Sequence, residues 1–549
     1  MKNVTYFYNA TIWMGDNVLP VEGWMAIQNE KIVELGKGKL PSQYLGLNAV
    51  DLNHRHIIPG LVDCHTHLSV SAWIPYTLDG SGWRSKKDVL QAVNQYATLQ
   101  SKDAWIIAFY ADFFQIGSLP TLQELTEAAE GRPVLINDFS LHKSLISEST
   151  MVKANLHQMA FHPNDIERKR GVPTGLIKET AHGHALSIAL TEFAQQFESL
   201  NILSMLEAEA DRHIAMGIVE AHDPCMHPKL QSAAEKLHER SPLRFSWSHV
   251  NTHEKADFVS DNVCLSCGAG PKSAKMFLDG ADDCAICLNP ADVMKMSAYS
   301  IGQSLTGNLD ALKTLTKARL TYRNGKIETK FLRSSTKDVT QRIDKLGEQA
   351  TRPKIHALGN KAISCACESL KNTGTKDATI EHLVMASDEN IEEVLECGAV
   401  ASLQPGFIQQ AKEIAASNIE KALHVIPAKT LLKSGASVAL SSDNPCGPLN
   451  PLHNIRRAVS RRSDDGLVID AKEALTISEA LKAYSIGGHH GIHCVPGDGL
   501  KPNAKANFVV LSGHPENAQT EVMQTWIAGE CFYSRSRHHN PLTQFENTV

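Results

Sequence analysis

The sequence predicts an α/β protein built on a TIM-like (β/α)8 barrel, with a small β-sandwich domain assembled from both ends of the chain. Two observations predict the barrel. Short, nearly all-apolar runs alternate with longer amphipathic stretches, and residue types that bind metals follow several of these runs. A third observation predicts the second domain, because the two ends of the chain share a pattern of short strands and polar turns.

Eight runs have the composition of buried parallel strands, which is the number that a (β/α)8 barrel requires. They are residues 60–63, 217–221, 243–247, 275–278, 353–355, 379–381, 399–403 and 437–440. A ninth run, residues 133–136, is surplus, and we assign it to an insertion between the first and second strands. The predicted domains are a first part of the sandwich at residues 1–58, the barrel at 59–487 with an insertion at about 70–215, and the second part of the sandwich at 488–549.

The composition is that of an ordinary globular protein. Of the 549 residues, 42% are hydrophobic and 21% are charged, which excludes a largely disordered or fibrous chain. The net charge of −6 comes from 54 basic and 60 acidic residues, without a long basic run. We therefore expect a small-molecule substrate and no nucleic-acid partner. The oligomeric state stays open, with a homodimer as one alternative.

The sequence predicts a cytoplasmic protein without membrane contact. Residues 1–8 lack the apolar core of a secretory signal. The longest apolar stretch, residues 105–114, is broken by Asp112 and is shorter than the ~20 residues that span a bilayer. The 12 cysteines do not make a disulfide scaffold in so long a chain, so we expect free thiols or metal ligands. The 25 histidines favour metal binding near neutral pH.

In a (β/α)8 barrel, catalytic residues lie at the carboxyl ends of the strands. His65 and His67 follow the first predicted strand, and alternate residues share a face, so both side chains can reach one ion. The other candidates stand at later strands: Lys275 in the fourth, His356 after the fifth, His382 after the sixth and Asp443 after the eighth. Together they predict a metal site at the mouth of the barrel.

Each of these residues also has a plainer explanation. A lone His-x-His pair is a weak signal, and a buried histidine often only satisfies a hydrogen bond. Asp443 could cap a helix or form an Asx turn. These explanations would have to hold separately at every strand end, so a metal site is the better interpretation.

The residue types indicate the chemistry of such a site. Nitrogen and carboxylate ligands are typical of Zn²⁺ and similar divalent ions, and one or two ions fit the set. A bound ion lowers the pKa of its water to about 7, so that hydroxide forms at neutral pH. Asp443 can then take the proton and pass it to a leaving amine. Lys275 is no ligand as an ammonium. If it reacts with CO₂, its carbamate could bridge two ions, and otherwise it needs a buried partner.

Six motifs, in their order along the chain, resemble the amidohydrolase superfamily and especially its family 3 branch, which includes N-substituted formamide deformylases and exoenzyme regulatory proteins. The motifs are PGLVDCHTH at residues 59–67, KMFLDG at 275–280, HALGNKA at 356–362, IEH at 380–382, SLQP at 402–405 and SDNP at 442–445. The resemblance covers nearly the whole chain. It implies the barrel and also the flanking β-sandwich, whose signature resembles GDGLKPNAKAN at residues 497–507.

The resemblance also implies roles for single residues. The metal ligands would be His65, His67, His356, His382 and Asp443, with Lys275 as a carbamylated bridge and Asp443 as the proton shuttle. His142, in FSLH at residues 139–142, resembles a histidine near the substrate, and a structural hydrogen bond is its alternative role. Glu179, in another family-like segment, is a lesser alternative ligand.

The chain departs from the family pattern at three places. Asn360 and Asn507 stand where the family usually has aspartate, and neither is an expected ligand. After Asp279 and Gly280 the sequence reads Ala-Asp-Asp-Cys rather than the usual run of small residues. This loop is expected to line the pocket, so the usual substrates of the branch do not carry over. We take Asp279 and Cys284 as candidate substrate contacts.

Two Cys-x-x-Cys pairs, at residues 264–267 and 284–287, have the spacing of a zinc ribbon. The fourth predicted strand lies between them, so the pairs leave from its opposite ends. A shared site would need a loop that folds back along the barrel. Cys284 could instead be a ligand in the pocket, a nucleophile or a small apolar filler.

We therefore expect a metal-dependent amidohydrolase that cleaves an amide or formamide C–N bond with metal-bound hydroxide. His382 or His142 would help to stabilise the oxyanion, and Asp443 would protonate the leaving nitrogen. A superfamily deaminase with a mononuclear site is one alternative, disfavoured by Lys275 and by the lack of an acidic residue shortly after His356. A non-catalytic regulator on the same scaffold is the other, and a lost ligand would support it.

Overall fold

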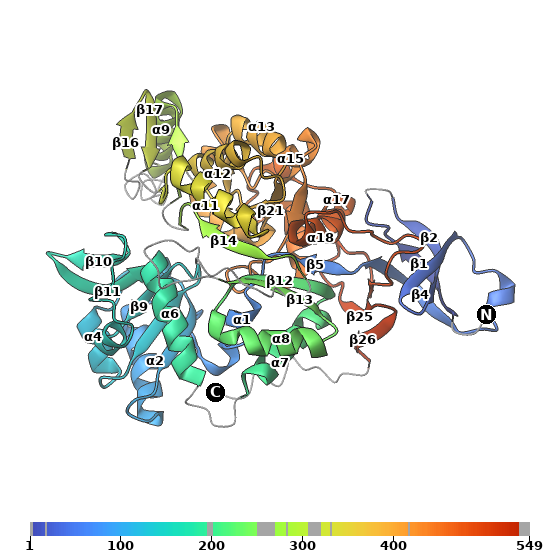
Figure 1. Ribbon diagram of the computed structural model, residues 1–549, viewed down its shortest axis with the longest axis horizontal. Coiled ribbons are helices and arrows are strands. Elements are labelled where there is room, and N and C mark those ends of the chain that lie inside the picture. The colour runs from blue at the N-terminus through green and yellow to red at the C-terminus, as the bar shows by residue number, and fades with distance from the viewer. Residues whose placement is uncertain are drawn as a thin grey trace.

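The computed structural model describes residues 4–16, 19–194, 201–249, 270–280, 284–305, 320–329, 332–415 and 418–536. Its central feature is a parallel sheet of eight strands that follow one another in the sheet as they do in the chain (Figure 1). The strands are β5 (Leu61–Asp63), β12 (Ile218–Met226), β13 (Arg244–His249), β14 (Ser273–Phe277), β18 (Arg352–Ala357), β19 (Thr379–His382), β21 (Val400–Leu403) and β23 (Val438–Leu440). Each of the eight predicted runs overlaps one of them. This is the TIM-barrel-like α/β fold that the sequence predicts.

Helices connect these strands along the chain. They are α7 (Ile202–Ala215), α8 (Gln231–Arg240), α9 (Pro290–Leu305), α11 (Thr336–Glu348), α12 (Asn360–Thr373), α13 (Asp388–Cys397), α14 (Ile408–Ala415) and α15 (Ala428–Ser434), followed by α16 (Pro451–Ser460), α17 (Ile477–Ala483) and α18 (Ile486–His493). Local sequence sets their ends. Ser335 and Ser387 form capping boxes at the starts of α11 and α13. Gly374 (φ 69°) and Gly398 (φ 74°) end α12 and α13 in the left-handed conformation that glycine adopts without a steric penalty.

The segments that follow the first and last strands of the parallel sheet are hydrogen bonded to each other. The backbone N–H of Asp443 donates to the carbonyl of His65 at 2.8 Å, and that of His67 donates to the carbonyl of Asn444 at 2.7 Å. Residues far apart in the sequence therefore meet at the carboxyl ends of β5 and β23.

Both ends of the chain contribute to a seven-stranded sheet. In sheet order its strands are β26 (Glu530–Ser534), β25 (Val522–Ile527), β24 (Phe508–Leu511), β4 (Ala49–Pro59), β1 (Val4–Ile12), β2 (Val21–Gln28) and β3 (Lys31–Lys37). The rings of Phe7, Phe508 and Trp526 pack together across it with centroids 5.1–5.3 Å apart. That this sheet packs as a β-sandwich stays a prediction.

A six-stranded sheet lies within the predicted insertion. In sheet order it contains β10 (Ile166–Lys169), β11 (Val172–Lys178), β9 (Lys143–Ile146), β8 (Val134–Asp138), β7 (Ile106–Ala111) and β6 (Leu78–Asp79). The surplus ninth run of the sequence is part of β8. The helices of this region are α1 (Leu68–Ser71), α2 (Lys86–Leu99), α3 (Phe113–Ile116), α4 (Leu122–Ala128), α5 (Glu148–Lys153) and α6 (Glu179–Phe193). Glu179, the first residue of α6, lies next to Gly280 after β14.

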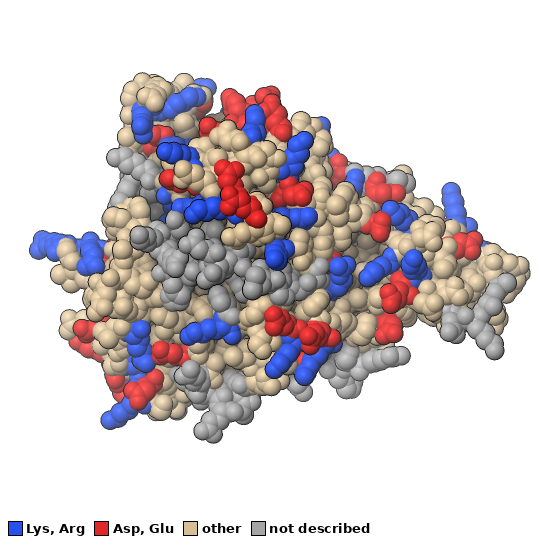
Figure 2. Space-filling model, viewed as in Figure 1, with Lys and Arg blue, Asp and Glu red and all other residues tan. Residues whose placement is uncertain are grey.

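Two small sheets complete the fold. One, of β15 (Cys287–Leu288), β17 (Lys326–Thr329) and β16 (Leu320–Arg323), stands with α9 between β14 and β18, and the other pairs β20 (Met385–Ala386) with β22 (His424–Val425). Acidic and basic side chains are interspersed on the face shown in Figure 2. Among the helices that the structure describes, none has the length and apolarity needed to cross a membrane.

Candidate metal centre

The six predicted metal-site residues line one cavity of about 440 Å³ at the carboxyl ends of the parallel strands. They are His65 and His67 after β5, Lys275 in β14, His356 in β18, His382 at the end of β19, and Asp443 after β23. His142 and Glu179 of the insertion line the same cavity. The cavity therefore lies between the parallel sheet and the insertion.

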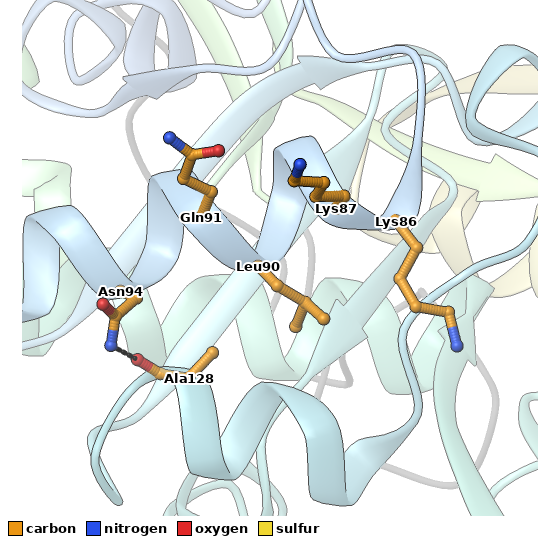
Figure 3. Close-up of a pocket in the computed structure, with 6 residues that line it drawn as sticks. All are labelled: Lys86, Lys87, Leu90, Gln91, Asn94 and Ala128. Atoms are coloured by element: carbon orange, nitrogen blue, oxygen red, sulfur yellow. Dashed lines mark hydrogen bonds between the residues drawn. The ribbon is translucent and has the colours of Figure 1, made fainter.

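A second depression lies between α2 and α4 (Figure 3). Its lining consists of Lys86, Lys87, Leu90, Gln91, Asn94 and Ala128. Asn94 spans the two helices with a hydrogen bond from its Nδ2 to the carbonyl of Ala128 at 3.1 Å. This lining contains no histidine, cysteine or carboxylate, so it offers neither metal ligands nor a general base.

The side chains of the cavity at the strand ends are in close contact. Asp443 Oδ1 lies 3.3 Å from His65 Nε2 and 2.9 Å from His67 Nε2. The ring centroid of His382 is 4.9 Å from that of His65 and 4.4 Å from that of His356. Four imidazoles and one carboxylate from four strands thus converge on one small volume.

The backbone has an unusual conformation at two of the candidate ligands. His382 (φ 82°) and Asp443 (φ 53°) both have a positive φ, which is rare for residues other than glycine and is concentrated at functional sites. Asp63 links the segments that carry His65 and Asp443. Its Oδ1 accepts the backbone N–H groups of Ser442 at 3.0 Å and His65 at 3.4 Å. Complete burial raises the pKa of Asp63 to about 7.

The unpaired atoms of these residues test whether a metal ion fits here. Among the residues that the structure describes, His65 Nδ1, His356 Nε2 and Asp443 Oδ1 are buried atoms without a hydrogen-bond partner. Buried polar atoms are nearly always paired, because each unpaired one costs about 1–3 kcal/mol. Asp443 Oδ1 stays unpaired although two imidazoles lie within 3.3 Å of it. Lone pairs that converge in this way fit a divalent cation.

The protonation states also fit a cation. Burial lowers the pKa of His356 and of His382 well below the usual value, so both imidazoles are neutral and keep a lone pair. His382 Nδ1–H donates a hydrogen bond to Gln404 Oε1 at 2.8 Å. Nε2 therefore keeps its lone pair for an ion. Burial raises the pKa of Asp443, but the neighbouring His65 outweighs this effect, and the pKa lies well below its usual value. Asp443 is therefore a carboxylate.

Glu381 is a residue of the site that the sequence analysis did not identify. It is fully buried at the end of β19 and forms an ion pair with Lys275, which is also buried. Its Oε2 also lies 3.3 Å from His65 Nδ1. Burial raises the pKa of Glu381, but His65 and Lys275 outweigh this effect and keep it well below its usual value. The signal in the sequence was indirect, since an ammonium at Lys275 required some buried anion.

His142 and Glu179 form a pair beside these ligands. His142 Nδ1 lies 2.9 Å from Glu179 Oε2, and the His142 ring centroid is 5.2 Å from that of His356. Glu179 is 7% exposed and has a positive φ of 46°. A Cβ atom at Gly280 would collide with the Glu179 carboxylate, so the glycine of the KMFLDG motif makes room for it. Glu179 thus orients His142 in the cavity.

Asp279 and Cys284 do not line this cavity. Asp279 is fully buried, and its carboxylate accepts the backbone N–H groups of Ala285, Leu358 and Gly359, each at 2.9 Å. It therefore holds together the loops after β14 and β18, and its Oδ1 is 3.8 Å from His356 Nε2. Cys284 is partly buried, and its carbonyl accepts a hydrogen bond from Thr329 Oγ1 at 2.7 Å.

The two Cys-x-x-Cys pairs are only partly described. Cys264 and Cys267 lie outside the described residues, as do residues 281–283 of the loop after β14. Cys287, at the start of β15, is partly buried and is not in a disulfide. A shared zinc site of the two pairs stays a prediction.

A buried carboxylate among four imidazoles at the ends of parallel strands is a donor set that suits a divalent metal ion. The chain belongs to the amidohydrolase family, whose profile matches residues 48–533. It is 23% identical to the N-substituted formamide deformylase of Arthrobacter pascens over 89% of this chain and 90% of that protein. It is 24% identical to the putative amidohydrolase YtcJ of Bacillus subtilis over 89% and 90% of the two chains.

Solved structures agree on the fold. The crystal structure of an uncharacterized metal-dependent hydrolase from Pyrococcus horikoshii superposes with a TM-score of 0.65 at 19% identity, over 97% of this chain and all of that chain. A hydrolase of the same description from Pyrococcus furiosus gives a TM-score of 0.63 at 18% identity, over 94% and 100%. The resemblance that the sequence motifs indicate is thereby confirmed.

Proposed function

We propose that this protein hydrolyses an amide or formamide C–N bond in the cavity at the strand ends. The observation that carries the proposal is Asp443, a buried carboxylate with an unpaired oxygen between two imidazoles. The similarity to an N-substituted formamide deformylase supports the choice of bond. His65, His67, His356, His382 and Asp443 would hold a divalent ion, for which Zn²⁺ suits the nitrogen and carboxylate donors best. When bound, the ion would act as a Lewis acid and lower the pKa of a water molecule in the site.

The proton transfers are assigned to Asp443. Because Oδ1 faces the imidazoles that would share the ion, Asp443 accepts a proton from the attacking water at Oδ2 and then gives the proton to the leaving nitrogen. His382 is less suited to contact the substrate, because its Nδ1 is engaged with Gln404. His142 can contact the substrate carbonyl, because it lines the cavity and its ring centroid is 5.2 Å from that of His356. The oxyanion role that the sequence analysis gave to either histidine is therefore assigned to His142.

The lining of the cavity indicates the substrate class. Trp73, Leu186, Leu190 and Ile202 give the cavity an apolar wall. Phe277 adds an apolar surface beside His356, with ring centroids 5.0 Å apart. Such a wall binds an alkyl or aryl substituent by removing apolar surface from water. We propose a neutral N-substituted amide whose nitrogen substituent lies against this wall.

Lys275 has two alternative states in this proposal. As an ammonium it is neutralised by Glu381, which makes the pair a support for His65 and leaves room for one ion. As a carbamate it would face the Glu381 carboxylate, and the two anions would need a cation between them. We propose the ammonium state, since Glu381 supplies the buried partner that it requires.

The arrangement of the domains is also proposed. We propose that the eight parallel strands close into a barrel, with a sandwich at residues 1–58 and 488–549 and an insertion at about 70–215. The backbone hydrogen bonds from Asp443 to His65 and from His67 to Asn444 support closure. A cytoplasmic location and a homodimer stay predictions.

The proposal is tested with a panel of N-formyl and N-acyl amines of increasing size, assayed for amine release. Protein loaded with Zn²⁺ should cleave them, and Asp443→Asn should lose at least about 10²-fold in kcat. Asp470→Asn is the matched control, because Asp470 is also a buried aspartate but accepts the backbone N–H of Val425 outside the cavity. Aminated heterocycles are assayed in parallel for ammonia, and its release from them without cleavage of the amides would indicate a deaminase instead. No turnover by zinc-loaded protein on the whole panel would refute the hydrolase.

A further inference from the structure

A second group of metal-ligating side chains lies away from the candidate metal centre. Glu220, His489 and His493 each offer one ligand atom, and these three atoms all lie within 4.8 Å of one another. Glu220 is the third residue of β12, whereas Cys225, five residues further along the same strand, lines the cavity of the metal centre. At about 3.3 Å per residue, Glu220 and Cys225 are about 17 Å apart along β12. The group therefore lies toward the amino ends of the strands.

The fold brings α18 against the parallel sheet so that this group can form. Figure 1 shows α18 beside β5 and β21. A Cβ atom at Gly487 would lie 2.3 Å from the carbonyl oxygen of Val438, and one at Gly488 would lie 2.4 Å from that of Val62. Only glycine allows the helix to approach the strands this closely. The carbonyl of Gly491 accepts a hydrogen bond from Lys354 Nζ at 3.0 Å, which fixes the helix further.

The two histidines stand four residues apart on α18 and so share one face of the helix. Their ring centroids are 4.3 Å apart. His489 Nδ1 lies 3.0 Å from the carbonyl oxygen of Val495. A carbonyl only accepts, so Nδ1 carries the proton and Nε2 has a free lone pair. A backbone carbonyl that fixes the tautomer in this way is the usual support of a metal-ligating histidine.

His493 and Glu220 complete the group. His493 Nε2 lies 2.7 Å from Glu220 Oε1, so without a metal the imidazole N–H donates a hydrogen bond to the carboxylate. A divalent ion can replace that proton and be bound by both atoms. The Glu220 side chain is 4% exposed and that of His493 is 15% exposed, so the site is sheltered but can be reached from solvent. Arg244 lies 3.7 Å from Glu220 Oε1 and can pair with the same carboxylate.

We propose that Glu220, His489 and His493 form a second binding site for a divalent transition-metal ion, with Zn²⁺ as the best match to two imidazoles and one carboxylate. Three protein ligands leave a fourth position for water in a tetrahedral site. A bound ion links α18 to β12 of the parallel sheet, through residues that are 273 positions apart in the sequence. It therefore stabilises the folded chain and takes no part in hydrolysis.

A second His and carboxylate cluster shows what a purely structural group looks like. Both ring nitrogens of His424 are engaged by carboxylates. Nδ1 lies 2.9 Å from Glu473 Oε1 and Nε2 lies 2.7 Å from Asp388 Oδ1, and both carboxylate oxygens accept. Glu473 is in turn occupied by the backbone and hydroxyl of Thr430. No lone pair of His424 is left for an ion, unlike His489 Nε2.

The test counts zinc in full-length protein whose metal centre is disabled by His65→Ala and His67→Ala. After treatment with a chelator, the protein is titrated with Zn²⁺ against a chromophoric chelator, and its Tm is recorded with and without zinc. We expect one equivalent of bound zinc and a rise in Tm. Adding His489→Ala should weaken binding at least about tenfold and abolish the rise. His490→Ala, a change of the neighbouring histidine on the same helix, should leave both unchanged.

Two results would overturn the proposal. One is that the disabled protein binds no zinc, and the other is that it binds zinc equally well with and without His489→Ala. If His489→Ala does not fold, Glu220→Gln replaces it, because the amide keeps the size of the side chain and removes the charge that zinc requires. Equal zinc binding by Glu220→Gln would likewise refute the site. None of these outcomes depends on hydrolytic activity.

Discussion

The buried pair of Lys275 and Glu381 gives a prediction that decides the state of the lysine. Both side chains are at most 1% exposed, and the pair lies against His65. Glu381→Leu removes the only anion paired with Lys275 among the described residues and leaves an uncompensated ammonium. Breaking a buried pair in this way costs about 3–5 kcal/mol, whereas replacing both partners by apolar residues is close to neutral.

The expected shift in Tm follows from the size of the chain. Unfolding entropy is about 2.1 cal/mol/K per residue, so 549 residues that unfold together give about 1.2 kcal/mol/K. A loss of about 3–5 kcal/mol then lowers Tm by about 3–4 °C. The double variant Lys275→Met with Glu381→Leu should recover most of this loss. The measurement is differential scanning calorimetry of metal-free protein, with all variants compared at one scan rate.

An exposed ion pair provides the control. Lys371 and Glu396 lie 2.7 Å apart, but their side chains are 50% and 59% exposed. Glu396→Ala should leave Tm unchanged within error, because exposed pairs contribute little. The reasoning about Lys275 is refuted if Glu381→Leu leaves Tm unchanged or raises it. A rise is what a carbamate at Lys275 predicts, because the variant would then relieve repulsion between two anions.

Three further predictions concern the cavity and the fold. His142→Gln should lower kcat/KM by about 10²–10³ on an N-formyl amine, and an unchanged value would exclude His142 from contact with the carbonyl. Leu190→Trp should fill part of the apolar wall and lower kcat/KM for bulky nitrogen substituents but not for methyl; an equal loss for all substrates would contradict the assignment of that wall. The hydrogen bond to Glu473 raises the pKa of His424, so its stabilisation is complete below the unfolded pKa and is lost as pH rises through the folded one. His424→Gln should therefore reduce Tm more at about pH 5.5 than at about pH 8.5, and the reverse order would refute the sign.

Much of the parallel sheet could be predicted from sequence because its signals are local. A buried parallel strand must be apolar on both faces, so each of the eight runs stands out without knowledge of its neighbours. That the candidate ligands line one cavity could be predicted for the same reason, since residues at the carboxyl ends of parallel strands meet in space. His65 and Asp443 are the clearest case. They are far apart in the chain and follow the first and last strands of the sheet, yet the backbone N–H of Asp443 donates to the carbonyl of His65.

The roles of several buried residues could not be predicted, because they depend on contacts between residues that are distant in the sequence. Glu381 stands beside His382, and nothing in that motif distinguishes a buried partner of Lys275 from a residue that supports the strand. Asp279 was expected in the pocket because of its place after β14, but three backbone N–H groups that only the folded loops bring together occupy its carboxylate. His489 and His493 form a visible pair on α18, yet their third partner, Glu220, lies on a strand that is remote in the sequence.

The interior between the two candidate metal sites is polar, and this determines how they have to be studied. His222, which is fully buried between them on β12, contacts the hydroxyls of Ser246 at 2.8 Å and Ser248 at 3.1 Å, and Lys354 reaches the carbonyl of Gly491 on α18. The loss of one partner of a buried polar group is costly, so a change at α18 can be transmitted to the strands that carry the candidate ligands. A loss of activity in His489→Ala would therefore not distinguish a ligand of a second metal ion from a residue that only positions α18. Zinc stoichiometry in the absence of the first site makes this distinction, because a positioning residue alters the geometry of the strands without removing a lone pair from the ion.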